Sequence, residues 1–483
     1  MPGWEALRLF FSQSSSSPVR NGGVSAAQSP AEGPAQATGL PHNPWYEQKL
    51  RVLLSTIGSR GDVQPLVALA WHLNAIGHEA RLCVPPDFRE WIESLGIPVT
   101  PIGPEVRQFA ASRPVPDQRR KMAEATVATQ FEAITAAAPG CDIIVAASAL
   151  QVAARSVAEK MGIPYVFAAY TPILLPSPHH PPPPLPPLPG EAPPPSNDNR
   201  NLWARNAARF HDLFGAALNA HRASLGLPPV SDAQSHMITD RPWLAADPTL
   251  GPWPDPPESG VFQTGAWILP DQRRLSRDLD AFIDSAKGRA GPPPAYGNGT
   301  PLTNSGAGRP VLREFIEERD PPIYFGFGST RAPQDAGQIM LQAARALGRR
   351  AIVSRGWFEA SLVENQADCL SIGEVNVHAL FPRVAVVVHH GGAGTTTAAA
   401  LAGAPQVVIP NHYDQHYWAQ RIDTLGIGAA HASGAPTVDS LASALDYALQ
   451  PEVAARARAI AAKLRCDGTE IAAERLIALA KSC

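Results

Sequence analysis

Features of secreted, membrane-spanning and nucleic-acid-binding proteins are scarce in this sequence. Its 483 residues include five cysteines, none of them in a CxxC pair, so neither a disulfide framework nor a zinc ribbon is expected. Charged residues make up 17% and the net charge is −3, which excludes the basic surface of a nucleic-acid binder. No apolar run is long enough for a membrane span. We therefore expect a cytoplasmic protein without a nucleic-acid partner.

The residues that are present predict an α/β protein. Hydrophobic residues make up 45%, enough for full cores, and the length suits two or three domains. Apolar strand patterns alternate with helical patterns after residue 48, which predicts βαβ units and parallel sheets. This alternation occurs twice, so the predicted fold class is two tandem Rossmann-like, doubly wound domains that face a cleft.

The domain boundaries follow from changes in composition. Residues 1–47 are rich in Ser, Ala, Gly and Pro, and we expect a disordered leader there. Proline and glycine predict loops within both domains, because proline fixes φ and has no backbone N–H. The expected divisions are an N-terminal domain at 48–240 with a Pro-rich loop at 172–200, a linker at 241–258, a C-terminal domain at 259–455 with a flexible loop at 288–310, and helices at 456–483 that pack back toward the N-terminal domain.

The most informative stretch is VVVHHGGAGTTT at residues 386–397. An apolar β-branched run ends at two histidines, turns through glycines and enters a helix, so a buried strand leads into a helix N-terminus. Free amides and the helix dipole make such a terminus an anion site, and glycine allows a phosphate to approach closely. The stretch favours a phosphate site, although an ordinary strand–helix turn with packed histidines is the alternative.

Asp62 follows the first strand, in the sequence GSRGD at residues 58–62. An aspartate at a helix start commonly caps the helix, and spacing alone favours that interpretation. The alternative is a general base at the mouth of the cleft.

Three further strand ends carry polar or aromatic residues. Gly328 and Ser329 in YFGFGST could donate hydrogen bonds to a phosphate. Trp357, after the strand at 351–354, could form the wall of a base pocket or pack in the core. Asp414 and Gln415 in PNHYDQ could both bind sugar hydroxyls.

Two patterns that could indicate a metal site are weak. His412 and His416 lie four residues apart, as two ligands on one helix do, but no glutamate follows His412 and no third ligand is evident. Asp278 and Asp280 belong to an amphipathic stretch and are typical of a solvated helix face. We expect no metal.

Taken in order, these motifs resemble the inverting UDP-glycosyltransferases of the GT-B fold, family 1. The similarity is greatest to the branch of bacterial glycopeptide-antibiotic glycosyltransferases and sterol 3-β-glucosyltransferases. It extends from residue 49 to the C-terminus apart from the inserted loops. The segments that carry it are GSRGDVQPLVALA, GAWILP, FGFGST, SRGW, EVNVHALFP, HHGGAGTTT and PNHYDQHYWAQR.

The resemblance implies a nucleotide-sugar site in the C-terminal domain and an acceptor site in the N-terminal domain. Asp62 matches the base that deprotonates the acceptor, and no histidine stands in this loop, so the histidine–aspartate dyad of many members does not transfer. Trp357 and Val375 match nucleoside contacts, and Asp414 and Gln415 match the pair that holds the donor sugar. The positions that match donor diphosphate contacts are Ser59, Arg60, Ser329, His390, Gly391, Gly392, Gly394 and Thr395.

The implied reaction moves a hexose from a UDP-sugar or TDP-sugar, with inversion and without a metal or other cofactor. The expected acceptor is hydrophobic, such as a sterol, a lipid, a polyketide or another natural-product aglycone, because the loop after Tyr170 is apolar with few charges. A lipid acceptor would imply a peripheral contact with membrane. Two alternatives are a nucleotide-sugar epimerase of the same fold and a non-catalytic partner protein that binds UDP-sugar.

Overall fold

A computed structural model describes residues 49–109, 119–183, 198–256, 259–285, 321–328, 335–356, 364–411, 413–432 and 435–481. The expected leader at 1–47 and the loop at 288–310 lie outside the described residues, as do Ser329, Trp357 and the segment 184–197 of the Pro-rich loop. No helix of the part that is described has the length and apolarity to cross a bilayer.

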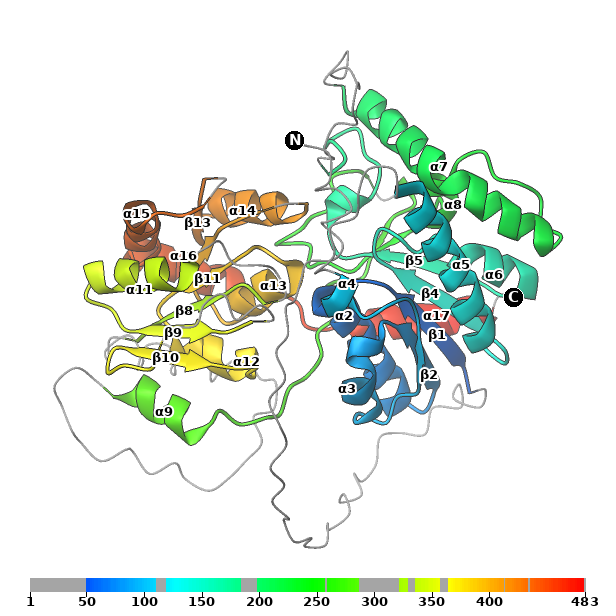
Figure 1. The fold of residues 1–483 in the computed structure, drawn as a ribbon. Helices are drawn as coiled ribbons and strands as arrows, with labels where there is room; N and C mark the ends of the chain where they lie inside the picture. Colours follow the sequence, from blue (N-terminus) through cyan, green and yellow to red (C-terminus); the bar gives the residue numbers. More distant parts are fainter. Residues whose placement is uncertain are drawn as a thin grey trace, which may run out of the picture.

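The first sheet is parallel throughout and has the order β3-β2-β1-β4-β5-β6-β7. Its strands β2, β1, β4 and β5 are labelled in Figure 1. Helices cover both faces, so a central strand such as β4 is buried along its whole length. One face packs on α2, α3 and α17, and the other on α5, α6 and α7. The strands are β1 (Arg51–Thr56), β2 (Glu79–Val84), β3 (Val99–Pro101), β4 (Ile143–Ala147), β5 (Tyr165–Ala169), β6 (Trp243–Leu244) and β7 (Phe262–Gln263). The helices are α2 (Arg60–Ala75), α3 (Arg89–Glu93), α4 (Val106–Phe109), α5 (Arg119–Ala137), α6 (Ala154–Met161), α7 (Asn199–Ser224), α8 (Ala233–Ile238) and α17 (Gly468–Lys481).

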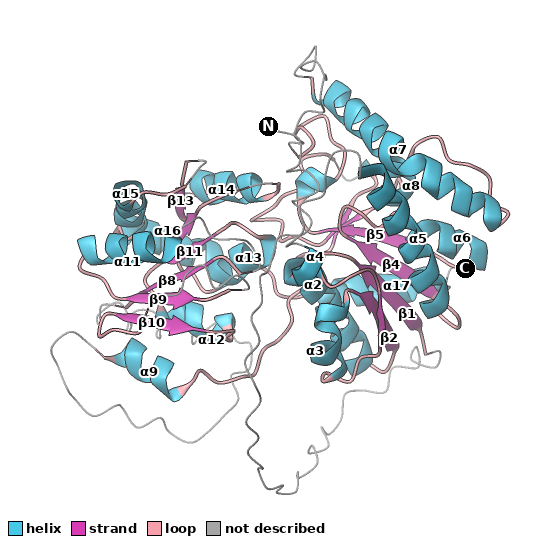
Figure 2. Ribbon diagram, viewed as in Figure 1, coloured by secondary structure: helices cyan, strands magenta, loops and turns pink. Residues whose placement is uncertain are grey.

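The second sheet is also parallel, with the order β10-β9-β8-β11-β12-β13. All of its strands except β12 are labelled in Figure 2. Its two faces pack on α11 with α15, and on α9, α12 and α13. The strands are β8 (Ile323–Gly326), β9 (Ala351–Ser354), β10 (Cys369–Ile372), β11 (Val387–His389), β12 (Gln406–Val408) and β13 (Gly428–Ala430). The helices are α9 (Arg277–Asp284), α11 (Ala336–Ala346), α12 (Val377–Leu380), α13 (Ala393–Leu401), α14 (Gln415–Thr424), α15 (Val438–Ala448) and α16 (Pro451–Ala461).

Both sheets have the same doubly wound topology. Counted within its own domain, each sheet begins 3-2-1-4-5-6, so the strand order reverses between β1 and β4 and again between β8 and β11. Ligands bind outside the carboxyl ends of the strands at such a reversal. The predicted fold class, two tandem Rossmann-like α/β domains, is confirmed.

The first sheet extends beyond the boundary predicted at residue 240. Strand β6 lies inside the expected linker and β7 lies beyond it, yet both pair with the first sheet. Each strand has two residues, too few for an alternation of apolar and polar residues to mark it. The boundary was therefore placed too early.

An apolar seam joins the domains at one side. Leu244 and Leu250 of the first domain share a buried cluster with Trp418 and Ile422 of α14. Arg421 adds hydrogen bonds from its guanidinium to the carbonyl oxygens of Leu250, at 2.8 Å, and Thr249, at 3.1 Å. Burial of this kind is the main source of stability in a domain contact.

Candidate active site

Asp62 occupies the third position of α2, directly after the turn that follows β1. Its Oδ2 accepts a hydrogen bond from the backbone N–H of Ser59 at 2.8 Å, so the carboxylate caps its own helix. Gly58 has φ +130°, and a Cβ at this position would collide with the Asp62 carboxylate. Glycine is needed here both for the backbone conformation and for the approach of Asp62.

The surroundings of Asp62 raise its pKa to about 7. Burial is the main cause, the hydrogen bond from Ser59 opposes it, and the charge of Asp414 raises the pKa further. The hydroxyl of Tyr170, beyond the end of β5, donates to the backbone oxygen of Asp62 at 3.1 Å. A carboxylate with this pKa is a far better base at neutral pH than an ordinary aspartate.

Asp414 comes from the other domain, in the loop after β12. The indole N–H of Trp418 donates to Asp414 Oδ2 at 3.1 Å, and burial raises the pKa of Asp414 to about 6. Its neighbour Gln415 is buried, and its Oε1 accepts the backbone N–H of Asn411 at 2.9 Å. Asp414 thus lies near enough to Asp62 for its charge to raise the pKa of Asp62, and Gln415 holds its own loop together.

The turn between β11 and α13 leaves a helix terminus open. Gly392 is the N-cap residue of this helix of nine residues and offers no side-chain cap. Within the described residues, the amides of Ala393, Gly394 and Thr395 donate to no protein acceptor. Gly394 is exposed, and a Cβ added to it would meet nothing within 4 Å. This terminus has the donors and the space that an anion requires.

The loops after β8 and β9 meet beside this turn. A Cβ at Gly328, after β8, would lie 3.5 Å from Cε1 of His390. A Cβ at Gly356, after β9, would lie 2.6 Å from the carbonyl oxygen of Gly328. The motifs FGFGST, SRGW and HHGGAGTTT are therefore brought together, although the contacts of Ser329 and Trp357 fall outside the described residues.

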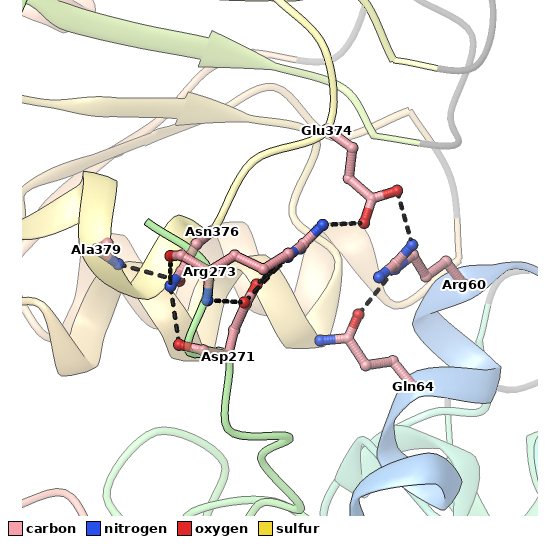
Figure 3. Close-up of polar contacts among 7 residues, drawn as sticks. All are labelled: Arg60, Gln64, Asp271, Arg273, Glu374, Asn376 and Ala379. Carbon is pink, nitrogen blue, oxygen red and sulfur yellow. Dashed lines mark hydrogen bonds and ion pairs between the residues drawn. The ribbon is translucent and has the colours of Figure 1, made fainter. Parts of the chain in front are cut away.

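Arg60 forms an ion pair with Glu374 of the other domain (Figure 3). Its Nη1 lies 3.0 Å from Glu374 Oε2, its Nε donates to Gln64, and its guanidinium lies 4.2 Å from the centre of the Trp91 ring. Glu374 also pairs with Arg273, at 3.2 Å. The guanidinium of Arg60, which was expected to approach the donor diphosphate, is paired with Glu374 in this arrangement.

Val375 follows Glu374 and lines a cavity of about 410 Å³ at the carboxyl ends of β9 and β10. Arg273, Arg355 and Asn376 line the same cavity. Its size suits a nucleoside or a similar small ligand. No cluster of three His, Cys, Asp or Glu side chains that could hold a metal ion occurs in the described part of the chain.

Sequence reasoning missed several residues of this site. The tertiary structure places Glu374 and Tyr170 against residues far away in the chain, whereas Trp418 contacts Asp414 one helical turn earlier. Their only signal in the sequence is their position after a predicted strand or within a recognised motif, which does not reveal a partner.

Two protein-family models match the chain. Residues 52–175 match the N-terminal domain of glycosyltransferase family 28, and residues 345–478 match the C-terminal domain of the erythromycin biosynthesis protein CIII-like family. The first segment contains the Asp62 turn and the second contains the open end of α13.

Curated relatives match over nearly the whole chain. Vancomycin aglycone glucosyltransferase of Amycolatopsis orientalis is 46% identical over 436 residues, which cover 89% of this chain and 97% of that protein. The dTDP-epi-vancosaminyltransferase of the same organism is 41% identical and covers 85% of this chain and 93% of its own.

Solved structures share the fold at low sequence identity. The glycosyltransferase of kitacinnamycin superposes with a TM-score of 0.61 at 19% identity, over 89% of this chain and 99% of that chain. VinC in complex with dTDP has a TM-score of 0.58 at 18% identity, over 90% and 100%. The superpositions show the GT-B fold, and the family models and curated relatives show that the chain is a glycosyltransferase with domains of families 1 and 28. Within this class the chain belongs to the glycopeptide-antibiotic branch, as its motifs predicted.

Proposed function

We propose that this enzyme transfers a hexose from a nucleoside diphosphate sugar to a hydroxyl of a natural-product aglycone, with Asp62 as the base. The observation that carries the proposal is the juxtaposition of a base with an open helix terminus. Asp414 lies close enough to Asp62 to raise its pKa, and a Cβ at Gly391 would lie 3.0 Å from the backbone oxygen of Gln415. The base and the α13 turn therefore flank residues 414 and 415.

In the proposed reaction, Asp62 accepts the proton of the acceptor hydroxyl while the oxygen of that hydroxyl attacks the anomeric carbon of the donor sugar. The bond to the nucleoside diphosphate breaks, and negative charge grows on the departing phosphate. The amides of Ala393, Gly394 and Thr395, with His390, stabilise that charge, so a metal is not required. A single displacement inverts the configuration at the anomeric carbon, through an oxocarbenium-like state.

The donor would place its nucleoside near Val375 and its sugar near Asp414. The proposed nucleobase of the donor is uracil or thymine. The volume of the cavity beside Val375 is compatible with a nucleoside of either kind. Arg60, Ser59 and Ser329 are further proposed contacts of the diphosphate, and Trp357 is a proposed contact of the base. For Arg60 this requires that Glu374 release it.

The proposed acceptor is an aglycone of the glycopeptide-antibiotic kind. A relative that is 46% identical bears the name vancomycin aglycone glucosyltransferase, and the match covers both domains. On the acceptor side, Ile173 and Leu175 are buried, and the ring of His180 packs edge-on against Trp203 and Trp253. His180 thus helps to shape this loop.

The decisive experiment offers the purified enzyme UDP-glucose or TDP-glucose with a panel of aglycones and measures the product by mass. A glycosylated aglycone with one equivalent of nucleoside diphosphate supports the proposal. Conversion of the donor without any acceptor indicates the epimerase instead. Binding of the donor without turnover against the whole panel indicates the non-catalytic partner. Retention of activity after treatment with EDTA would support the metal-independent mechanism, and its loss would refute it.

A further inference from the structure

His389, the last residue of β11, is a fully buried titratable group that the proposed reaction does not use. Its Nδ1 accepts the backbone N–H of Gly391 at 3.0 Å, and its Nε2 lies 2.8 Å from Oε1 of Gln406. Gln406, on β12, is also fully buried and donates from Nε2 to the carbonyl oxygen of Thr396 at 3.3 Å. One chain of hydrogen bonds therefore links the glycine turn, the neighbouring strand and α13.

These contacts determine which ring nitrogen carries the proton. A backbone N–H can only donate, so Nδ1 of His389 is an acceptor, and Nε2 carries the hydrogen that Gln406 Oε1 accepts. Burial lowers the pKa of His389 to about 4, so the ring stays neutral near pH 7. A proton on Nδ1 would place two donors against each other.

The position of Gly391 leaves little freedom at this turn. Its φ is +91°, and an added Cβ would lie 2.7 Å from Cγ1 of Val408 and 3.0 Å from the oxygen of Gln415. His389 takes the N–H of Gly391, and among the described residues the amides of Gly392, Ala393, Gly394 and Thr395 donate to no protein acceptor.

We propose that His389 and Gln406 are positioning residues for the nucleoside diphosphate. His389 holds Gly391, and through it the first turn of α13, in the conformation that presents the free amides to the ligand. Gln406 selects the ring tautomer that makes this possible. Neither residue touches the ligand, because both are fully buried. This inference rests on the proposed function, since it assumes that the turn binds a diphosphate.

The test compares the binding of UDP and of TDP, by calorimetry, among three variants. His389→Leu removes the acceptor and leaves the Gly391 N–H without a partner, so the dissociation constant should rise about tenfold or more. His389→Asn supplies an amide oxygen for the same N–H, and affinity should return to within about threefold of the wild type.

His78→Leu is the matched control. His78 is also buried, and its Nδ1 accepts the backbone N–H of Leu50 at 3.2 Å, but it belongs to the other domain, just before β2 at the amino ends of the strands of the first sheet. Its loss should lower the midpoint of thermal unfolding and leave nucleotide binding within about twofold of the wild type, because additivity holds between distant sites.

Each result decides the matter. Wild-type affinity in His389→Leu would overturn the inference, as would His389→Asn binding as weakly as His389→Leu. Should His389→Leu fail to fold, the ¹⁵N shifts of the wild-type His389 ring decide: a proton on Nε2 between pH 6 and 8 supports the inference, and a proton on Nδ1 refutes it. If the wild type binds neither UDP nor TDP, the proposed function fails first, which is a distinguishable outcome.

Discussion

The turn from β1 into α2 and the turn from β11 into α13 share the positions of their glycines but differ in the charge at the helix terminus. Each has a glycine with positive φ, Gly58 at +130° and Gly391 at +91°. Each helix has a glycine at its second position, Gly61 and Gly394. The third position differs, because α2 has Asp62 there and α13 has Thr395.

That one difference gives the two helix termini different chemistry. In α2 the carboxylate accepts the Ser59 N–H, so the helix terminus carries its own anion. In α13 no side chain caps the terminus, so its amides remain for an external anion. The same backbone conformation thus carries a buried carboxylate in one domain and uncapped amides in the other, and the proposed base and the proposed phosphate site depend on this contrast. Four substitutions or conditions test this contrast.

The largest effect is expected for Asp62→Asn. Loss of the base should lower kcat by about 10²- to 10⁴-fold, while the affinity for nucleoside diphosphate stays within about twofold. The asparagine oxygen can still accept the Ser59 N–H, so α2 keeps its cap. Steady-state kinetics and calorimetry check the two halves of this prediction, and near-normal turnover would remove Asp62 from the mechanism.

Thr395→Asp would give α13 the side chain that α2 has. A carboxylate at the third helical position should weaken nucleoside diphosphate binding by about 100-fold or more, because it places like charge beside the phosphate and takes up a donor. It should also stabilise the helix, by about 0.3–1 kcal/mol. Calorimetry and thermal unfolding measure both. Thr395→Asn is the uncharged control, and unchanged binding in Thr395→Asp would place the phosphate elsewhere.

The pH dependence follows from the raised pKa of Asp62, to about 7. The ionised base predominates above that value, so kcat/KM should rise through pH 7 and level off above pH 8. In the unfolded chain the Asp62 carboxyl titrates near pH 4. Between about pH 4 and 7 this carboxyl is therefore protonated in the folded state and ionised in the unfolded state. The free energy of unfolding consequently falls as pH rises from about 4 to 7. Asp62→Asn should therefore gain thermal stability relative to the wild type at pH 8 and not at pH 4. An equal difference at both would show that Asp62 is not perturbed.

The smallest effect is expected for Glu374→Gln. The Arg60–Glu374 pair connects the Asp62 turn to the other domain, but Glu374 is 56% exposed, and such pairs contribute less than about 1 kcal/mol. Thermal unfolding should change little, and the change should disappear at high salt. Glu93→Gln, which breaks the exposed Arg89–Glu93 pair within α3, is the control. A large loss of stability in Glu374→Gln alone would show that the polar bridge carries more of the domain contact than the apolar seam.

Long apolar patterns allowed most of the fold to be predicted. The strand expected at 351–354 is β9, and the alternation of strands and helices expected after residue 48 is present in both domains. The two-residue strands β6 and β7 escaped prediction, because a pair of residues has no periodicity. Helix α5 (Arg119–Ala137) was also missed, since its polar residues alternate with small ones and no clear apolar stripe is visible in the sequence.

The site shows the same division. Local rules found the two glycine turns, because a strand that ends in glycine before a helix is a feature of adjacent residues. The spacing of residues favoured Asp62 as a helix cap over a general base, and Asp62 does cap α2. Local rules could not show that Asp414 lies beside Asp62, because that proximity arises only when the two domains meet.

The order of residues alone was thus sufficient for the class of fold, the family and the two turns, since helices, strands and caps depend on neighbours within a few positions. Folding in three dimensions decided the rest: the raised pKa of Asp62, the pairing of Arg60 with Glu374 and the proton on His389. Each of these is set by burial, or by contacts between segments that are distant in the chain, and the dielectric and geometry of such a contact exist only after the domains have packed.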